Sequence, residues 1–244
     1  MHFISEGVRE AVHLLLHENG ELGHILWVTL RVAVCSTALA ALVGLPLGLL
    51  FGLGRFRGRR VGIALLNAGL GLPPVVVGLV VALFLFRGAP LGGLELIYTV
   101  NGIILAQALL ALPLAAAFTA AAVQVIPGAL LDQARALGAA RRQVAVLALR
   151  EARVGVVGAL IAAFGSALSE VGAVILVGGN IHAQTQTLAS AVLTEVSEGQ
   201  YGTAIALGLI LLGLIVVCGA LLTVAQQRGS GDEGGAPWFR WRAS

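Results

Sequence analysis

The sequence predicts an all-α polytopic membrane protein with about five transmembrane helices, an N-terminal interfacial helix and a helical polar loop. Composition is the first indication. The chain of 244 residues is 58% hydrophobic and only 11% charged, which is too apolar for a soluble domain of this size. The pattern of apolar residues is the second. They form long runs without the alternation of a β-barrel, and only helices or closed barrels can span a bilayer.

Five segments are long and apolar enough to cross a bilayer, which takes about 20 helical residues. They are residues 22–53, 61–86, 97–120, 154–178 and 201–225. Pro73 and Pro74 break the second segment, because proline removes a helix hydrogen bond. We therefore expect residues 1–225 to form one transmembrane domain and residues 226–244 to form a flexible, glycine-rich tail.

The N-terminal segment reads as an amphipathic helix over residues 3–20 that lies along the membrane surface. His13, His17 and Glu21 recur at steps of four and would share one face of it. Metal binding is one interpretation of that spacing. Gly20 interrupts the helix and no second cluster of ligands joins it, so we favour a solvated polar face and expect no bound metal.

Arginine placement predicts the orientation. Of fifteen basic residues, twelve fall in two loops and the tail: Arg55, Arg57, Arg59, Arg60, Arg135, Arg141, Arg142, Arg150, Arg153, Arg228, Arg240 and Arg242. The opposite side has Arg9 and Arg87 only. Loops rich in basic residues stay in the cytoplasm. We therefore expect the N-terminus outside, the loop 121–153 and the C-terminus inside, and a membrane rather than a nucleic acid as the partner of these charges.

Two charged residues lie deep within predicted spans. Arg31 and Glu170 are each about 10 Å from the outer end of their helix at 1.5 Å per residue. Unpaired charges at such depth are costly, so an ion pair between them is the first hypothesis. The alternative is that Arg31 extends to the outer surface while Glu170 is protonated or bonded to backbone.

Several polar side chains are candidates for an anion pathway. A path for an anion needs hydrogen-bond donors without strong fixed charge, so that the ion can both enter and leave. The candidates are Ser166, Ser169, Asn180, Thr185 and Thr187. Hydrogen bonding between helices is the more common role for such residues and stays open as the alternative. Glu170 would repel an anion, so we interpret it as structural.

The polar loop at residues 132–153, DQARALGAARRQVAVLALREAR, holds five arginines between two apolar spans. It resembles the coupling loop of ABC importer permeases, whose pattern is Glu-Ala-Ala, three residues, then Gly. Asp132, Gln133, Ala134 and Gly138 stand at those places. Where many permeases have Leu-Pro, this chain has Arg150-Glu151, which is similar to the tungstate permease branch.

Three further stretches resemble the same branch: GLPPVVVGLVVALFLFRGAPLG at 71–92, ILAQALLALPLA at 104–115 and SEVGAVILVGGNI at 169–181. The resemblance runs from about residue 22 to 225. The outer loop TQTLASAV departs from it, since the branch tends to have a basic residue near Thr185. That departure bears on any transfer of substrate contacts.

The resemblance implies a type I ABC importer fold in a bacterial inner membrane. Two copies of this chain would assemble with two cytoplasmic ATPase subunits and an extracytoplasmic oxyanion-binding protein, and would contact membrane lipid. ATP and magnesium would bind the ATPase, so this chain would be non-catalytic and hold no cofactor. Tungstate would be the cargo, with molybdate or another oxyanion as the alternative. The ATPase contacts would be Asp132, Gln133, Ala134, Arg135, Gly138, Ala139, Arg141 and Arg142.

Two other classes of function, a secondary transporter and a membrane-embedded enzyme, fit the sequence less well. A secondary transporter usually has an internal repeat and several ionisable residues at the midplane, whereas Arg31 and Glu170 are the only deep charges in the predicted spans. A membrane-embedded enzyme would need a nucleophile and base, or a metal cluster, at matching depth. All five histidines lie at or beyond the predicted outer face. The chain lacks lysine, so it has no nucleotide-binding P-loop.

Overall fold

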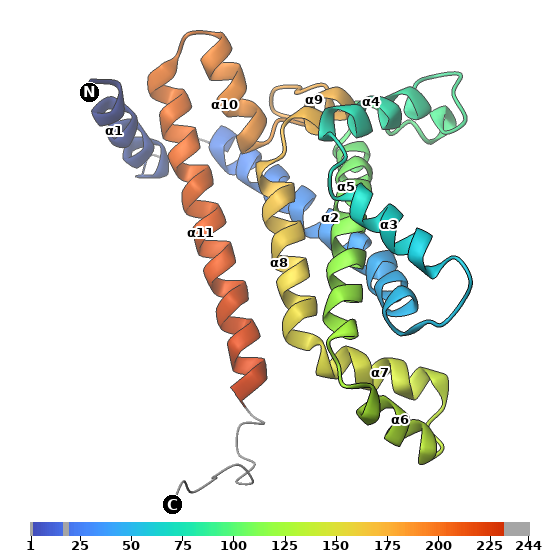
Figure 1. The fold of residues 1–244 in the computed structure, drawn as a ribbon. Helices are drawn as coiled ribbons and strands as arrows, with labels where there is room; N and C mark the ends of the chain where they lie inside the picture. The colour runs from blue at the N-terminus through green and yellow to red at the C-terminus, as the bar shows by residue number, and fades with distance from the viewer. Residues whose placement is uncertain (1, 17–19, 232–244) are drawn as a thin grey trace, which may run out of the picture.

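The computed structural model describes residues 2–16 and 20–231, and every regular element within them is helical. The elements are α1 (His2–Leu16), α2 (Gly20–Leu53), α3 (Arg59–Gly69), α4 (Pro74–Leu85), the 3-10 turn η1 (Gly92–Leu94), α5 (Val100–Gln124), α6 (Gly128–Ala136), α7 (Arg141–Glu151), α8 (Arg153–Ser169), α9 (Gly172–Gly178), α10 (Leu188–Ser197) and α11 (Tyr201–Gly231). Figure 1 shows α5, α8 and α11 along the length of the molecule, with α6 and α7 at one end and α4, α9 and α10 at the other.

Helices α2 and α5 make the most extensive helix contact in the described part of the chain. The approach is close because α2 has Gly44, Gly48 and Gly52 at intervals of four residues. A Cβ atom built on Gly48 would lie 2.5 Å from Thr119 Cβ, which is shorter than any real contact. One built on Gly44 would lie 2.8 Å from Ala115 Cβ. Small residues at helix interfaces let backbones approach in a membrane protein.

The number of membrane spans agrees with the sequence prediction. Helices α2, α5 and α11 are each long and apolar enough to cross a bilayer. The pairs α3 with α4 and α8 with α9 meet the same criterion as bent spans, with bends of 101° and 62°. The chain is thus a multi-pass helical membrane protein with three to five spans. The predicted break at Pro73-Pro74 is confirmed, since α4 begins at Pro74.

The fourth predicted span, 154–178, is wrong as a single helix. Helix α8 ends at Ser169 and α9 begins at Gly172, and Glu170 between them has an extended backbone with φ −76° and ψ 132°. Apolar composition does not reveal this break. The broken ends meet those of the other bent span, because Gly78 of α4 packs against Ala173 of α9: a Cβ built on Gly78 would lie 2.6 Å from Ala173 Cα.

The two ends of the chain refine the sequence prediction. Helix α1 forms as expected and packs against α11, where Gly7 faces Ile205. Its placement in a membrane interface remains a prediction. Helix α11 continues through Gly231, so the tail starts later than residue 226. His17 and residues 232–244, with most of the predicted tail, lie outside the described residues.

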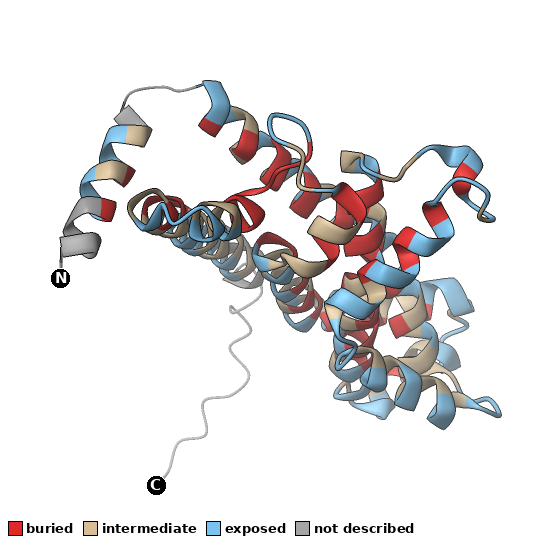
Figure 2. Ribbon diagram, turned by 90° about the horizontal axis from the view of Figure 1, so that it is seen from above, coloured by how far each residue is buried: buried red, intermediate tan, exposed pale blue. Residues whose placement is uncertain are grey.

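Burial separates the central helices from the peripheral ones. Figure 2 shows the buried residues concentrated where the central helices face one another. Helix α3, in contrast, has no buried residue along its length. It is held at its start, where the Arg59 guanidinium donates to the carbonyls of Phe51 and Gly52 at the end of α2, at 2.7 and 3.3 Å. The helical core is therefore α2, α5, α8 and α9.

Replacing Gly48 with valine should lower the free energy of unfolding by roughly 1–3 kcal/mol or more, because the new side chain overlaps Thr119 and the Ala116 carbonyl. Thermal unfolding of the detergent-purified chain measures the change. Gly213→Val on α11 is the matched control, since a Cβ there meets nothing within 4 Å. Equal melting temperatures for the two variants would contradict a glycine-dependent α2–α5 contact.

Candidate coupling and translocation site

The arginine-rich loop folds into a helical hairpin of α6 and α7. Pro127, at the start of α6, has the fixed φ that begins a helix, −56° here. Leu131 of α6 and Val144 and Ala148 of α7 are buried against Val123 at the end of α5. The same cluster includes residues at the start of α8. The hairpin is therefore attached to two central helices through apolar contacts.

A tight turn joins the two helices of the hairpin. Gly138 has φ +85°, a left-handed conformation that glycine adopts without strain. No atom lies within 4 Å of a Cβ built there, so the backbone angle and not space requires glycine. Leu137 precedes it and is 89% exposed, the highest exposure among the large apolar residues of the described chain. A single exposed leucine is common on protein surfaces, so its exposure makes Leu137 available for a contact and does not by itself show one.

The predicted coupling residues all lie on this hairpin. Gln133, Arg141 and Arg142 are exposed, and Ala134 and Ala139 are half-buried. A salt bridge of 2.6 Å joins exposed Arg135 to Asp132 one turn earlier. The Gln143 side chain accepts a hydrogen bond of 2.7 Å from the Ala140 N–H at the start of α7. The sequence did not single out Leu137, although an apolar residue directly before Gly138 in a polar loop was the available signal.

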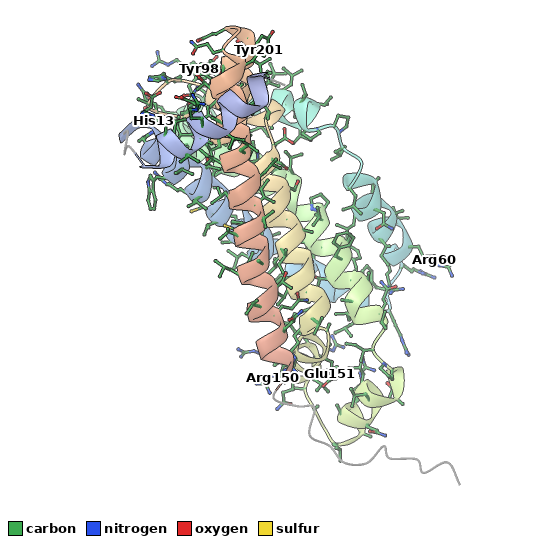
Figure 3. All side chains as sticks on the ribbon, turned by 90° about the vertical axis from the view of Figure 1, so that its left-hand side faces the viewer. His13, Arg60, Tyr98, Arg150, Glu151 and Tyr201 are labelled. Atoms are coloured by element: carbon green, nitrogen blue, oxygen red, sulfur yellow. The ribbon has the colours of Figure 1, made fainter. Side chains whose placement is uncertain are left out.

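The last helix, α11, contacts the start of α8, just after the hairpin. The Gln226 side-chain amide donates a hydrogen bond of 2.6 Å to the carbonyl of Val154, the second residue of α8. Figure 3 shows Arg150 and Glu151 at this same end of α11, while Tyr201 lies at its opposite end. Helix α8 therefore contacts both α7 of the hairpin and α11.

The expected ion pair between Arg31 and Glu170 does not form. Arg31 is exposed and its guanidinium donates to Asn101 Oδ1 on α5 at 3.2 Å. Glu170 is half-buried, and its Oε1 accepts the N–H of Ala173 at 3.2 Å. The reason is the break before α9: it leaves N–H groups without helix partners, and the carboxylate satisfies one of them. The structural role expected for Glu170 agrees with this contact.

The pathway candidates fall into two groups. Thr185 and Thr187 are buried and already hydrogen-bonded: the Thr185 hydroxyl donates to the Gly178 carbonyl at 2.7 Å, and Thr187 caps α10. Asn180 donates to the Thr194 hydroxyl at 2.7 Å. These three hydrogen-bonding side chains hold the loop between α9 and α10, and their role in a pathway remains a prediction. Ser166 and Ser169 are exposed on α8 and remain candidates.

An acidic cavity of about 320 Å³ lies at the end opposite the hairpin. Its lining includes Glu21, His182, Glu195 and Glu198, and His182 Nε2 lies 3.3 Å from Glu21 Oε1. Burial, and then the charges of Glu198 and Glu21, raise the pKa of Glu195 above its ordinary value of 4.5, partly offset by His182. The sequence did not predict this cluster, because its members come from α2, from α10 and from the segments on either side of α10. The described residues contain no group of three or more potential ligands placed to hold a metal.

These features define a class: a multi-pass helical membrane protein with two bent spans and a polar, arginine-rich hairpin that packs against its central helices at one end. Comparison with known proteins then identifies the family. Residues 44–230 match the binding-protein-dependent transport system inner membrane component family. The chain belongs to this family, the non-catalytic permease subunits of ABC transporters, which function with ATPase and binding-protein subunits.

Individual relatives cover most of the chain. It is 44% identical to a probable anion ABC transporter permease protein of Haloferax volcanii over 85% of this chain and 91% of that one. It is 37% identical to the tungstate uptake system permease protein TupB of Peptoclostridium acidaminophilum, over 93% and 100%. A solved structure of the MetNI methionine ABC transporter in an inward-facing conformation has the same fold, with a TM-score of 0.65 and 22% identity over 85% and 94%.

Replacing Glu195 with glutamine should stabilise the protein at neutral pH. The folded state raises the pKa of this carboxyl, so its ionised form costs folding free energy at any pH above the raised value. That cost disappears below about pH 4, where the group is protonated in both states. We expect a higher melting temperature for Glu195→Gln at pH 7 and no difference at low pH, measured in detergent.

The control for the change in net charge is Glu95→Gln, at an exposed residue outside this cavity. An equal rise in melting temperature for both variants at pH 7 would show that net charge, and not the environment of Glu195, is responsible.

Proposed function

We propose that this chain is the permease subunit of an ABC importer for a tetrahedral oxyanion, most specifically tungstate. The observation that carries the proposal is the similarity over essentially the full length of the tungstate permease TupB, at 37% identity. The related anion permease at 44% identity supports the oxyanion class. A molybdenum transport permease, ModB of Escherichia coli, is 29% identical over 78% of the chain, and makes molybdate the second candidate.

The chemistry of the exposed pathway candidates suits an anion. Ser166 and Ser169 are exposed on α8 just before its break, and their hydroxyls can donate to oxyanion oxygens without holding the ion by full charge. Ser169 now donates to the Gly165 and Ser166 carbonyls, at 3.1 and 3.2 Å. Such bonds within one helix turn exchange readily for a bond to a passing ion. The break between α8 and α9 allows this helix to change direction at the same level.

We propose that the hairpin transmits movement of the ATPase subunit to the membrane-spanning helices. A cytoplasmic ATPase subunit would bind the turn at Leu137 and Gly138, with Arg135, Arg141 and Arg142 around it. Because Leu131 and Val144 pack into the ends of α5 and α8, displacement of the hairpin moves those helices as rigid bodies. ATP and magnesium act on the ATPase, and this chain converts its closure into a change of access.

The assembly and orientation follow the same proposal. Two copies of the chain form the path, with the N-terminus outside and the hairpin in the cytoplasm of a bacterial inner membrane. The arginine distribution supports this orientation, since the segments 54–60 and 128–153 hold nine of the fifteen arginines. The acidic end with Glu21, Glu195 and Glu198 then faces the extracytoplasmic binding protein.

The first experiment measures ATP hydrolysis by liposomes that hold the chain with its ATPase, with and without a tungstate-loaded binding protein. Leu137→Gln should reduce the stimulated rate on the order of tenfold or more, as expected for loss of an anchor residue. Val125→Gln is the control, because Val125 is also exposed, at 83%, but lies outside α6 and α7. Equal rates for both variants would contradict coupling through the turn, and ion uptake without ATP would favour a secondary transporter.

The cargo is tested by uptake of labelled tungstate, molybdate and sulfate into the same liposomes. Tungstate uptake that exceeds molybdate uptake at equal saturation of the binding protein is the expected result. A reversed order would make molybdate the cargo, and uptake of neither would reject both assignments.

The two groups of pathway candidates should respond differently to substitution. Ser166→Ala with Ser169→Ala should slow uptake and leave the melting temperature unchanged. Thr185→Val should lower the free energy of unfolding by about 2–3 kcal/mol, because it leaves the Gly178 carbonyl and the Ile181 N–H without their partner. Uptake and thermal unfolding on the same preparations separate the two roles. Slow uptake with normal stability in Thr185→Val would instead indicate that Thr185 contributes to the translocation pathway.

A further inference from the structure

A groove of about 720 Å³ lies between the end of α2 and the helical hairpin. Its floor is apolar, with Leu50 and Leu53 of α2 on one side and Val144 of α7 on the other. Three arginines from separate elements surround it: Arg55 after α2, Arg135 on α6 and Arg141 at the start of α7. The site thus combines apolar walls with a concentrated positive charge.

The positive charge of the groove is only partly balanced. No acidic side chain lines it among the described residues. Asp132, beside it, pairs with Arg135. The side chains of Arg55 and Arg141 form no hydrogen bond or ion pair with any residue in the described part of the chain, 2–16 and 20–231. Arg141 is also the first residue of α7, where the helix dipole is positive and disfavours another positive charge. The groove therefore favours an anion.

The apolar floor specifies what kind of anion fits. A small free anion would gain nothing from Leu50, which is 52% exposed, or from Leu53 and Val144 beside it. A phospholipid has both parts in the required order, a charged phosphate followed by hydrocarbon chains. The groove is also at the right depth, because α2 is a membrane-spanning helix that ends at Leu53, two residues before Arg55. Headgroups lie where such helices leave the bilayer.

The groove extends to the hairpin turn, because Ala139 of the turn lines it together with Arg135 and Arg141. Helix α7 packs against both α6 and the end of α2, and Figure 1 shows it between them. The exposed Leu137 does not line the groove, which opens between α7 and a spanning helix. Arg135 and Arg141 are shared with the proposed ATPase contact, so lipid binding is measured on the purified chain without the ATPase.

We propose that this groove is a binding site for an anionic phospholipid. Arg55 and Arg141 bind the headgroup phosphate, with Arg135 beside them, and an acyl chain lies along Leu50 and Leu53. The site anchors the hairpin to the membrane surface and makes its position depend on lipid charge. It involves no oxyanion cargo and does not depend on the identity of the cargo.

The test titrates the purified full-length chain with diacyl phosphatidylglycerol and reads bound lipid by native mass spectrometry. Each basic residue near an anionic lipid contributes about fivefold in affinity. Arg55→Gln with Arg141→Gln should therefore weaken binding about 25-fold. The matched control is Arg57→Gln with Arg142→Gln, which removes the same charge from the same two segments but from residues that do not line the groove. The control should bind as the wild type does.

Two further probes separate the possible sources of the anion. Phosphatidylcholine with the same chains should bind weakly and equally to both variants, and glycerol phosphate should not compete with phosphatidylglycerol. Full competition by glycerol phosphate would show a site for a small soluble anion and overturn the proposal. Equal phosphatidylglycerol binding by the two double variants would also overturn it. If Arg55→Gln with Arg141→Gln only weakened capture of the ATPase subunit, the groove would belong to a protein interface instead.

Discussion

The close approach of α2 and α5 is the contact on which the rest of the structure depends. In a lipid environment burial of apolar surface gives helices little reason to associate, so association rests on fitted contacts between backbones. Gly44, Gly48 and Gly52 provide that fit along one side of α2. Helices α3, α8 and α9 each pack against one or both helices of this pair. A bulky residue in the glycine series would force α2 and α5 apart.

The two broken spans follow from a second constraint, the cost of unbonded backbone groups in an apolar environment. At the first break the chain uses proline, which has no N–H to satisfy, as the first residue of α4. At the second it uses the Glu170 carboxylate, which accepts the Ala173 N–H. The helices after the two breaks, α4 and α9, pack on each other through Gly78. Both breaks therefore lie in one region, where the two bent spans are in direct contact.

The hairpin at the opposite end connects these spans to the surface. Its inner face is part of the apolar core through Leu131, Val144 and Ala148, and its outer end exposes Leu137. The Gln226 amide ties α11 to the start of α8 just after the hairpin. An element that is packed on one side and exposed on the other can transmit a displacement without unfolding. The arginines around it give this end of the molecule a concentrated positive charge.

The sequence by itself determined the class of fold, the number of spans, the break at Pro73 and the position of the arginine-rich helical loop, because hydropathy, proline and charge act locally along the chain. It did not determine which polar groups meet. Arg31 bonds Asn101 and not Glu170, and the Thr185 hydroxyl bonds the Gly178 carbonyl in the α9–α10 loop.

Only the tertiary structure decided those partners, the second helix break and the groove with Arg55 and Arg141. A partner depends on the rotation of each helix about its axis and on breaks that apolar composition does not reveal. Both are set by close contacts such as Gly48 with Thr119 and Gly78 with Ala173, whose members lie far apart in the sequence.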